Sequence, residues 1–128
     1  MNLESIADYL AALAIGETGK TLFVNEMPSS CTNGILLMDS YQGARTDLYL
    51  PDYYHSEFRL VIRSVDFLTG KALARTASKK LNLMKGQVGD LLVYRASALN
   101  LPRPYRRSAG GYWEFEVDME IVFIDTET

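Results

Sequence analysis

The sequence predicts a small α+β domain with a mixed, largely antiparallel sheet and two helices packed on one face. Residues 112–124 alternate strictly, so apolar side chains fall on one side of a strand and four carboxylates on the other. Residues 3–15 and 68–81 carry apolar residues at the three- and four-residue spacing of amphipathic helices. A sheet with one buried and one charged face, covered by two helices, accounts for both patterns.

The N-terminal half begins with the predicted helix over residues 3–15, which Gly16 ends. Residues 21–27 read as a strand, and the turn that follows leads into a second strand over residues 35–41. Residues 42–54 show few strand signals, and we expect a surface loop there. That loop carries Tyr49, Tyr53 and Tyr54.

The C-terminal half begins with a strand over residues 57–65, followed by Asp66 as the N-cap of the second helix. The apolar stripe of that helix is predicted to contain Leu68, Ala72, Leu73, Ala77 and Leu81. A loop with Gly86 and Gly89 leads to a strand over residues 90–99. A loop over residues 100–111 then leads to the final strand. The predicted order of elements is α-β-β-β-α-β-β.

Length and composition bound the protein class. The 128 residues fit a single domain over residues 1–128, and a net charge of -3 gives no general attraction to nucleic acid or to anionic membranes. No apolar run approaches the roughly 20 residues of a membrane span, and the first residues lack the basic start of a signal peptide. The single cysteine, Cys31, excludes an internal disulfide, so we expect synthesis in a reducing cytoplasm.

The carboxylates of the last strand are the first candidate site. Like charges in a row repel one another unless water or cations lie against them. Arg59 and Arg63 lie on the outer face of the strand at 57–65 and would face the carboxylates if the two strands were neighbours. The pattern allows two interpretations, a solvated ladder of ion pairs or a subunit interface. The interface residues would be Arg59, Arg63, Glu114, Glu116, Asp118 and Glu120.

The basic loop over residues 101–111 is the second candidate site. Three arginines and a tyrosine could contact phosphates or a protein partner, and copies of the loop around a ring would form a basic collar. The alternative is a solvated hairpin loop. The side chains concerned are Arg103, Tyr105, Arg106 and Arg107.

Catalytic, cofactor and metal sites are not predicted. The segment 16–21 imitates the end of a phosphate-binding P-loop, but Ala14 stands where the pattern requires glycine, and the segment leaves a helix to enter a strand. Cys31 and His55 are the sole residues of their types, and nothing in their spacing places them together. We therefore expect a protein that is not an enzyme and binds no cofactor.

The order and local character of several segments resemble the tail-terminator or minor capsid proteins of long-tailed bacteriophages. The segments are the N-terminal helix, residues 22–28, residues 34–38, residues 60–66 with the alanines after them, and the paired final strands. The resemblance implies an α/β sandwich whose copies form a ring, commonly a hexamer. Such a ring caps the tail tube, stops its polymerisation and joins the tail to the head connector.

The same resemblance implies partners and a location. The partners would be further copies of the chain, the tail tube protein and a head-completion or connector protein, with transient contact to passing DNA. The location would be the head–tail junction of the virion, and no membrane would be involved. Two other hypotheses stay open from the residues alone. One is a small cytosolic enzyme or nucleotide-binding domain using residues 16–21, and the other is a monomeric binding module using the tyrosine-rich loop at 49–54.

Overall fold

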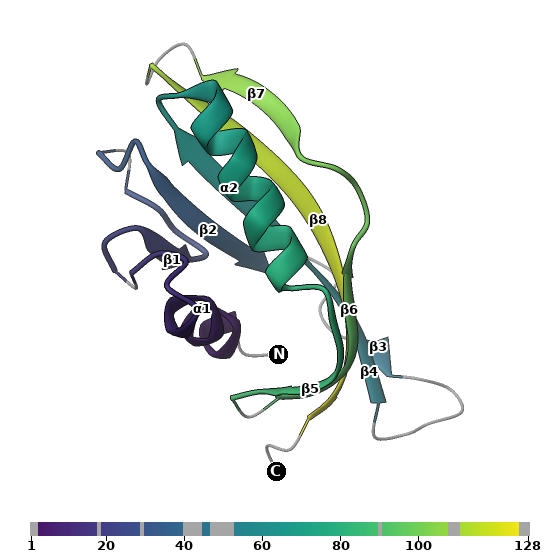
Figure 1. Cartoon of the computed structure of the whole chain (residues 1–128). Coiled ribbons are helices and arrows are strands. Elements are labelled where there is room, and N and C mark those ends of the chain that lie inside the picture. The colour runs from purple at the N-terminus through teal and green to yellow at the C-terminus, as the bar shows by residue number, and fades with distance from the viewer. Residues whose placement is uncertain are drawn as a thin grey trace.

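The computed structural model describes residues 3–17, 19–28, 30–39, 45–46, 53–89, 91–107 and 111–125. Within these residues the chain forms two helices and one sheet of eight strands (Figure 1). The helices are α1 (Leu3–Ala12) and α2 (Phe67–Lys80). The strands are β1 (Leu22–Val24), β2 (Gly34–Asp39), β3 (Arg45–Thr46), β4 (Tyr53–Ser64), β5 (Leu83–Val88), β6 (Leu91–Ala98), β7 (Arg103–Arg107) and β8 (Tyr112–Asp125).

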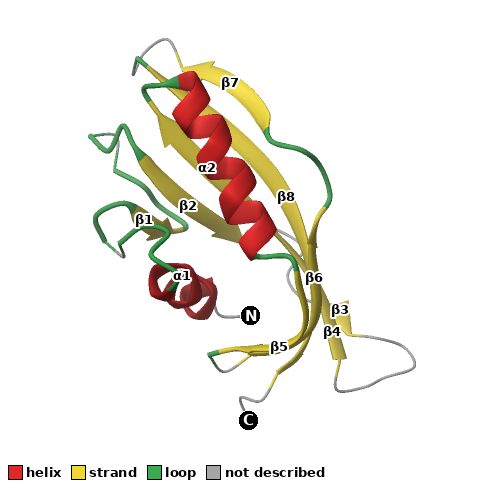
Figure 2. Cartoon of the chain, in the orientation of Figure 1, coloured by secondary structure: helices red, strands yellow, loops and turns green. Residues whose placement is uncertain are grey.

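The sheet has the strand order β1-β2-β4-β8-β6-β5, with β3 added beside β4 and β7 beside β8. Only the β1–β2 pair is parallel among the described strands, and every other pairing is antiparallel. Both helices lie on the same side of this curved sheet (Figure 2). The predicted fold class, an α+β domain with a largely antiparallel sheet, is confirmed.

The long β4–β8 pair lies at the centre of the sheet. Its register runs without a break from Tyr53 opposite Ile124 to Ser64 opposite Trp113. Strands β6 and β7 lie end to end along the other edge of β8. The side chain of Asn100 fills the gap between them, because its Oδ1 accepts from the Asp118 N–H at 2.9 Å and its amide donates to the Glu116 carbonyl at 3.3 Å.

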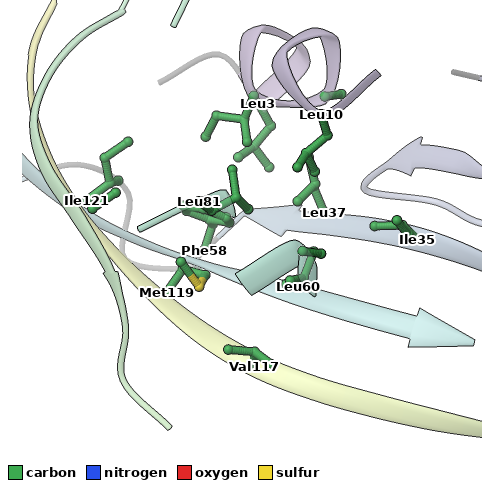
Figure 3. Close-up of a cluster of buried hydrophobic side chains, with 14 of the residues drawn as sticks. Leu3, Leu10, Ile35, Leu37, Phe58, Leu60, Leu81, Val117, Met119 and Ile121 are labelled. Atoms are coloured by element: carbon green, nitrogen blue, oxygen red, sulfur yellow. The ribbon is translucent and has the colours of Figure 1, made fainter. Parts of the chain in front are cut away.

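The hydrophobic core lies between the helices and the inner face of the sheet. Phe115, Val117 and Met119 are each at most 1% exposed, which confirms the predicted register of the last strand. Leu3 and Leu10 point from α1 toward Leu37 of β2 (Figure 3). Burial of these side chains is the main stabilising contribution on this side of the sheet.

Helix α2 packs closely on β8 because its buried face is made of small residues. Asp66 caps the helix as predicted, accepting from the Thr69 N–H at 2.8 Å. A Cβ at Gly70 would lie 2.6 Å from Cε2 of Phe115, so only glycine allows this approach. The predicted apolar stripe was wrong at Leu68, which is 72% exposed, and at Ala72, which is also exposed. The buried face is formed by Gly70 and Ala74 together with Ala77, which the prediction included.

Three further predictions need correction. Residues 83–88 form an edge strand rather than a loop, since an edge tolerates Gly86 and the missing pair at Lys85 beside it. Residues 103–107, also predicted as a loop, form β7, whose Pro104 is acceptable on a strand with an open edge. Of the predicted 42–54 loop, residues 45–46 are a strand and Tyr53 and Tyr54 begin β4, whereas Tyr49 lies outside the described residues.

Candidate assembly surface

Four carboxylates of β8, those of Glu114, Glu116, Asp118 and Glu120, lie on the outer face of the sheet, opposite the helices. Each one forms an ion pair with an arginine of the same chain. The register places Arg63 opposite Glu114 and Arg59 opposite Asp118, which is the arrangement predicted if the strands were neighbours. We call this set the outer ion-pair network: Arg59, Arg63, Arg95, Arg103, Glu114, Glu116, Asp118 and Glu120.

The Arg63–Glu114 pair is buried. Nε of Arg63 donates to Oε2 of Glu114 at 2.9 Å, and the two side chains are only 14% and 8% exposed. Nη1 of Arg63 also donates to the carbonyls of Pro28 at 3.0 Å and Cys31 at 3.3 Å, and the guanidinium lies over the ring of Tyr112. Arg63 therefore links Pro28 and Cys31, before β2, to strands β4 and β8, which is a structural role within the chain.

Asp118 sits between two arginines from different strands. Its carboxylate accepts from Nε of Arg59 at 3.1 Å and from an Nη of Arg103 at 2.9 Å. Burial by itself would raise the pKa of Asp118, but the bonds from the two guanidinium groups outweigh it, so the pKa lies below its usual value. The hydrogen bond to Asp118 raises the pKa of Arg59 in return. Asp118 thus links β4, β7 and β8.

Glu120 is paired with an arginine that the sequence analysis did not identify. Nη2 of Arg95 donates to Oε1 of Glu120 at 2.7 Å. A bulge between Val93 and Arg95 adds one residue to β6, so the buried Val93 and the outward Arg95 face opposite sides despite their spacing of two. Reading residues 90–99 with a strict period of two hides this outward position. The one signal in the sequence is that the last strand carries four carboxylates, whereas the strand at 57–65 offers only two arginines to pair with them.

The basic segment at 101–111 is divided by the structure. Arg103, at the start of β7, is part of the outer ion-pair network and also lies 3.9 Å from Glu116. Tyr105 is exposed on the same strand. The side chains of Arg106 and Arg107 lie outside the described part of the structure, so their contact with a partner or a ring lumen stays a prediction. Contact of the outer ion-pair network with another copy also stays a prediction.

The P-loop-like segment shows no geometry for holding a phosphate. The N–H groups of Lys20, Thr21 and Leu22 all donate to the carbonyl of Glu17, at 3.0, 2.9 and 3.0 Å. The Glu17 N–H donates to Oγ1 of Thr21, and the Lys20 ammonium pairs with the Glu17 carboxylate at 3.4 Å. A P-loop needs such donors directed at its ligand. Here they are used within the turn.

Cys31 and His55 are separated by the fold. Cys31 lies in the turn before β2, where its thiol is 3.2 Å from the Asn33 carbonyl, whereas His55 lies in β4 opposite Val122. Among the described residues, no three His, Cys, Asp or Glu side chains come together as a metal site would require. No helix within the described ranges has the length and apolar character to cross a membrane.

Comparisons with known proteins give one family and one fold. The family model described as "Bacteriophage tail terminator protein" matches residues 9–123. A chain of the solved structure "Virion of native gene transfer agent (GTA) particle" superimposes with a TM-score of 0.59 at 14% identity, covering 90% of this chain and 84% of that chain. No curated protein matches the sequence.

Proposed function

This chain belongs to the bacteriophage tail terminator protein family, and from that membership we propose that its copies form a ring that caps the tail tube. The ring would terminate tube polymerisation and join the tail to the head connector, so its partners are the tube protein, a head-completion or connector protein and further copies of itself. Its place is the head–tail junction of the virion. Ring size follows from neither the fold nor the match, although six copies is the number that the sequence resemblance implies.

One observation carries the proposal: the family match covers residues 9–123, from the last turn of α1 through α2 and nearly all of the sheet, rather than a single motif. The fold agrees with that of a chain from a virion particle. The family is one of phage tail proteins, not of enzymes. The described structure also agrees with a structural role. Its two central strands are paired along their length, and within the described residues no three His, Cys, Asp or Glu side chains converge as a metal site would require.

Tube assembly in the presence of the chain tests this function. Purified tail tube protein of the same phage would be polymerised with and without the chain, and tube lengths measured by electron microscopy. We expect shorter tubes carrying extra density at one end. Native mass spectrometry of the chain released from those tubes should show a closed oligomer. Tubes of unchanged length and bare ends at saturating chain concentration would overturn the proposal.

The basic segment offers a second, finer test. Arg106 and Arg107 are proposed to contact the connector, the tube or passing DNA, whereas Arg103 serves the fold. Replacing Arg106 and Arg107 by serine should leave the unfolding free energy unchanged and reduce the yield of joined particles. Arg103→Ser is the matched control, because it removes the pair with Asp118 and should act on stability first. A wild-type particle yield from the Arg106/Arg107 variant would remove the segment from the functional account.

The nucleotide-binding hypothesis makes an opposite prediction. A recess of about 250 Å³ is lined by Gly16, Thr21 and the first turns of α2, and Arg63 is the one arginine or lysine among the described residues that line it. That cation is already paired with Glu114. Calorimetry with ATP and GTP plus magnesium should therefore show no binding heat. A stoichiometric signal at micromolar concentration would restore the hypothesis.

A further inference from the structure

The two helices carry opposite and unmixed charge. Helix α1 (LESIADYLAA) contains acidic residues and no lysine or arginine, whereas α2 (FLTGKALARTASKK) contains lysines and arginine and no acidic residue. Both helices lie on the inner side of the sheet and present one face to solvent (Figure 2). This separation contrasts with the outer side of the sheet, where acids and arginines are mixed and paired.

Helix α2 presents an exposed basic stripe, which we define as Lys71, Arg75 and Lys79. Residues four apart lie on one face of a helix and about 6 Å apart along its axis. Among the described residues, none of these three cations takes part in an ion pair, whereas the four arginines of the outer ion-pair network all do. Leu68, 72% exposed, and Ala72 lie beside the stripe on the same face.

Helix α1 presents the matching acidic face. Glu4 and Asp8 are both exposed and also lie four residues apart, with Ala11 and Ala12 next along that face. Leu13, directly after the helix, is 40% exposed. Small side chains at 11 and 12 permit close approach of another helix. The acidic face therefore has the same spacing as the basic stripe and a comparable apolar end.

We propose, resting on the ring function above, that the basic stripe of α2 docks against the acidic face of α1 in the next copy. An antiparallel alignment sets Asp8 against Arg75 and Glu4 against Lys79, and it brings Leu13 toward Leu68. It also places the positive end of one helix dipole beside the negative end of the other. The contact joins two different patches, so each copy uses both and the arrangement can close into a ring.

The charge distribution favours a second copy over nucleic acid. Three cations on a chain of net charge -3 would bind duplex DNA weakly at cellular salt. The next copy instead supplies carboxylates at matching intervals. The carboxylates of the outer ion-pair network are already neutralised within their own chain, so they offer less complementarity to a neighbour than the exposed Asp8 of α1 does.

Charge reversal tests the contact through sedimentation of the full chain at low salt. Asp8→Lys and Arg75→Glu alone should each weaken self-association at least about tenfold. Mixing the two variants should restore it, because in an alternating arrangement every boundary pairs either the wild-type charges or the reversed ones. The double variant Asp8→Lys/Arg75→Glu should also assemble. Glu26→Lys and Lys85→Glu, which make the same charge changes at other exposed positions, should assemble like wild type.

Several outcomes would overturn the contact. One is wild-type assembly by both single variants, and another is failure of the mixture although each variant keeps wild-type circular dichroism and melting. A wild-type chain that stays monomeric at the highest soluble concentration would also do so. Loss of duplex DNA binding by Arg75→Glu without loss of assembly would assign the stripe to DNA instead. If the variants still cap tubes normally, the helix contact is rejected but the proposed ring function is not. Failure of the contact can therefore be distinguished from failure of the function.

Discussion

Arg63 and Arg59 provide a matched pair of perturbations on one strand. Both point from the outer face of β4 toward carboxylates of β8, and they lie four residues apart. The side chain of Arg59 is 47% exposed, whereas that of Arg63 is 14% exposed. Replacement by methionine keeps most of the aliphatic volume and removes the charge and the donors. The two substitutions therefore separate a buried ion pair from an exposed one.

The expected losses differ by several kcal/mol. Arg63→Met leaves the buried Glu114 carboxylate without its 2.9 Å partner and removes the donors to the Pro28 and Cys31 carbonyls. Breaking a buried pair in this way costs about 3–5 kcal/mol. Arg59→Met should cost less than about 1 kcal/mol, because the pair is exposed and Asp118 keeps its bond to Arg103. Arg63→Met/Glu114→Gln should recover part of the loss, since a neutral amide then replaces the buried carboxylate.

Urea unfolding followed by the fluorescence of Trp113 and by circular dichroism measures these differences. Trp113 is the single tryptophan, and its ring packs against Phe67 of α2. Each variant would be unfolded at two protein concentrations, so that any contribution from self-association appears as a concentration dependence. Equal losses for the two methionine variants, or no recovery in the double variant, would refute the assignment of Arg63–Glu114 as a structural pair.

Three shorter predictions follow from the same geometry. Phe115→Ala should cost about 3–5 kcal/mol and Glu116→Gln less than about 1 kcal/mol in urea unfolding, and the reverse ranking would mean that the strand faces are exchanged. Gly70→Ala should destabilise by about 1–3 kcal/mol despite the better helix propensity of alanine, because the new Cβ meets Phe115 at 2.6 Å; a stabilised variant would contradict that packing. The pKa of Asp118 is lower in the folded chain than in the unfolded chain, so its stabilising contribution is complete above about pH 4 and is lost as the pH falls toward the folded-state pKa. Asp118→Asn should therefore flatten the acid limb of a plot of unfolding free energy against pH, and an unchanged limb would refute this.

The long central strands could be predicted from sequence because their pattern is local. Alternation over residues 112–124 assigns the two faces of that strand without knowledge of its neighbours. The positive charges of Arg59 and Arg63, opposite in sign to its carboxylates, pointed to the strand at 57–65 as a neighbour, which is the pairing that the structure has. Such features depend on side-chain period and charge sign, both of which can be read from the chain itself.

The errors arose where a tertiary contact overrides local pattern. Residues 83–88 and 103–107 carry glycine or proline, which discourage strand prediction, yet both segments are edge strands that need hydrogen bonds on one side only. The buried face of α2 was misplaced because Gly70 and Ala74 carry less hydrophobic signal than Leu68, although their small size is what permits contact with β8. Propensity scales do not contain that information.

The outer ion-pair network explains how apolar side chains on the outer face of the sheet are shielded from water, although the helices cover the inner face only. Val61 and Leu36 point outward, opposite one another on β4 and β2, yet they are 4% and 8% exposed. Long arginine and glutamate side chains lie around them, and the stems of such side chains cover apolar surface while their charged ends reach water. The network therefore acts as the second layer of the domain. A layer already satisfied within its own chain gains little from a neighbour, so the proposed ring would rely on cations that form no ion pair within the described residues, such as those of α2.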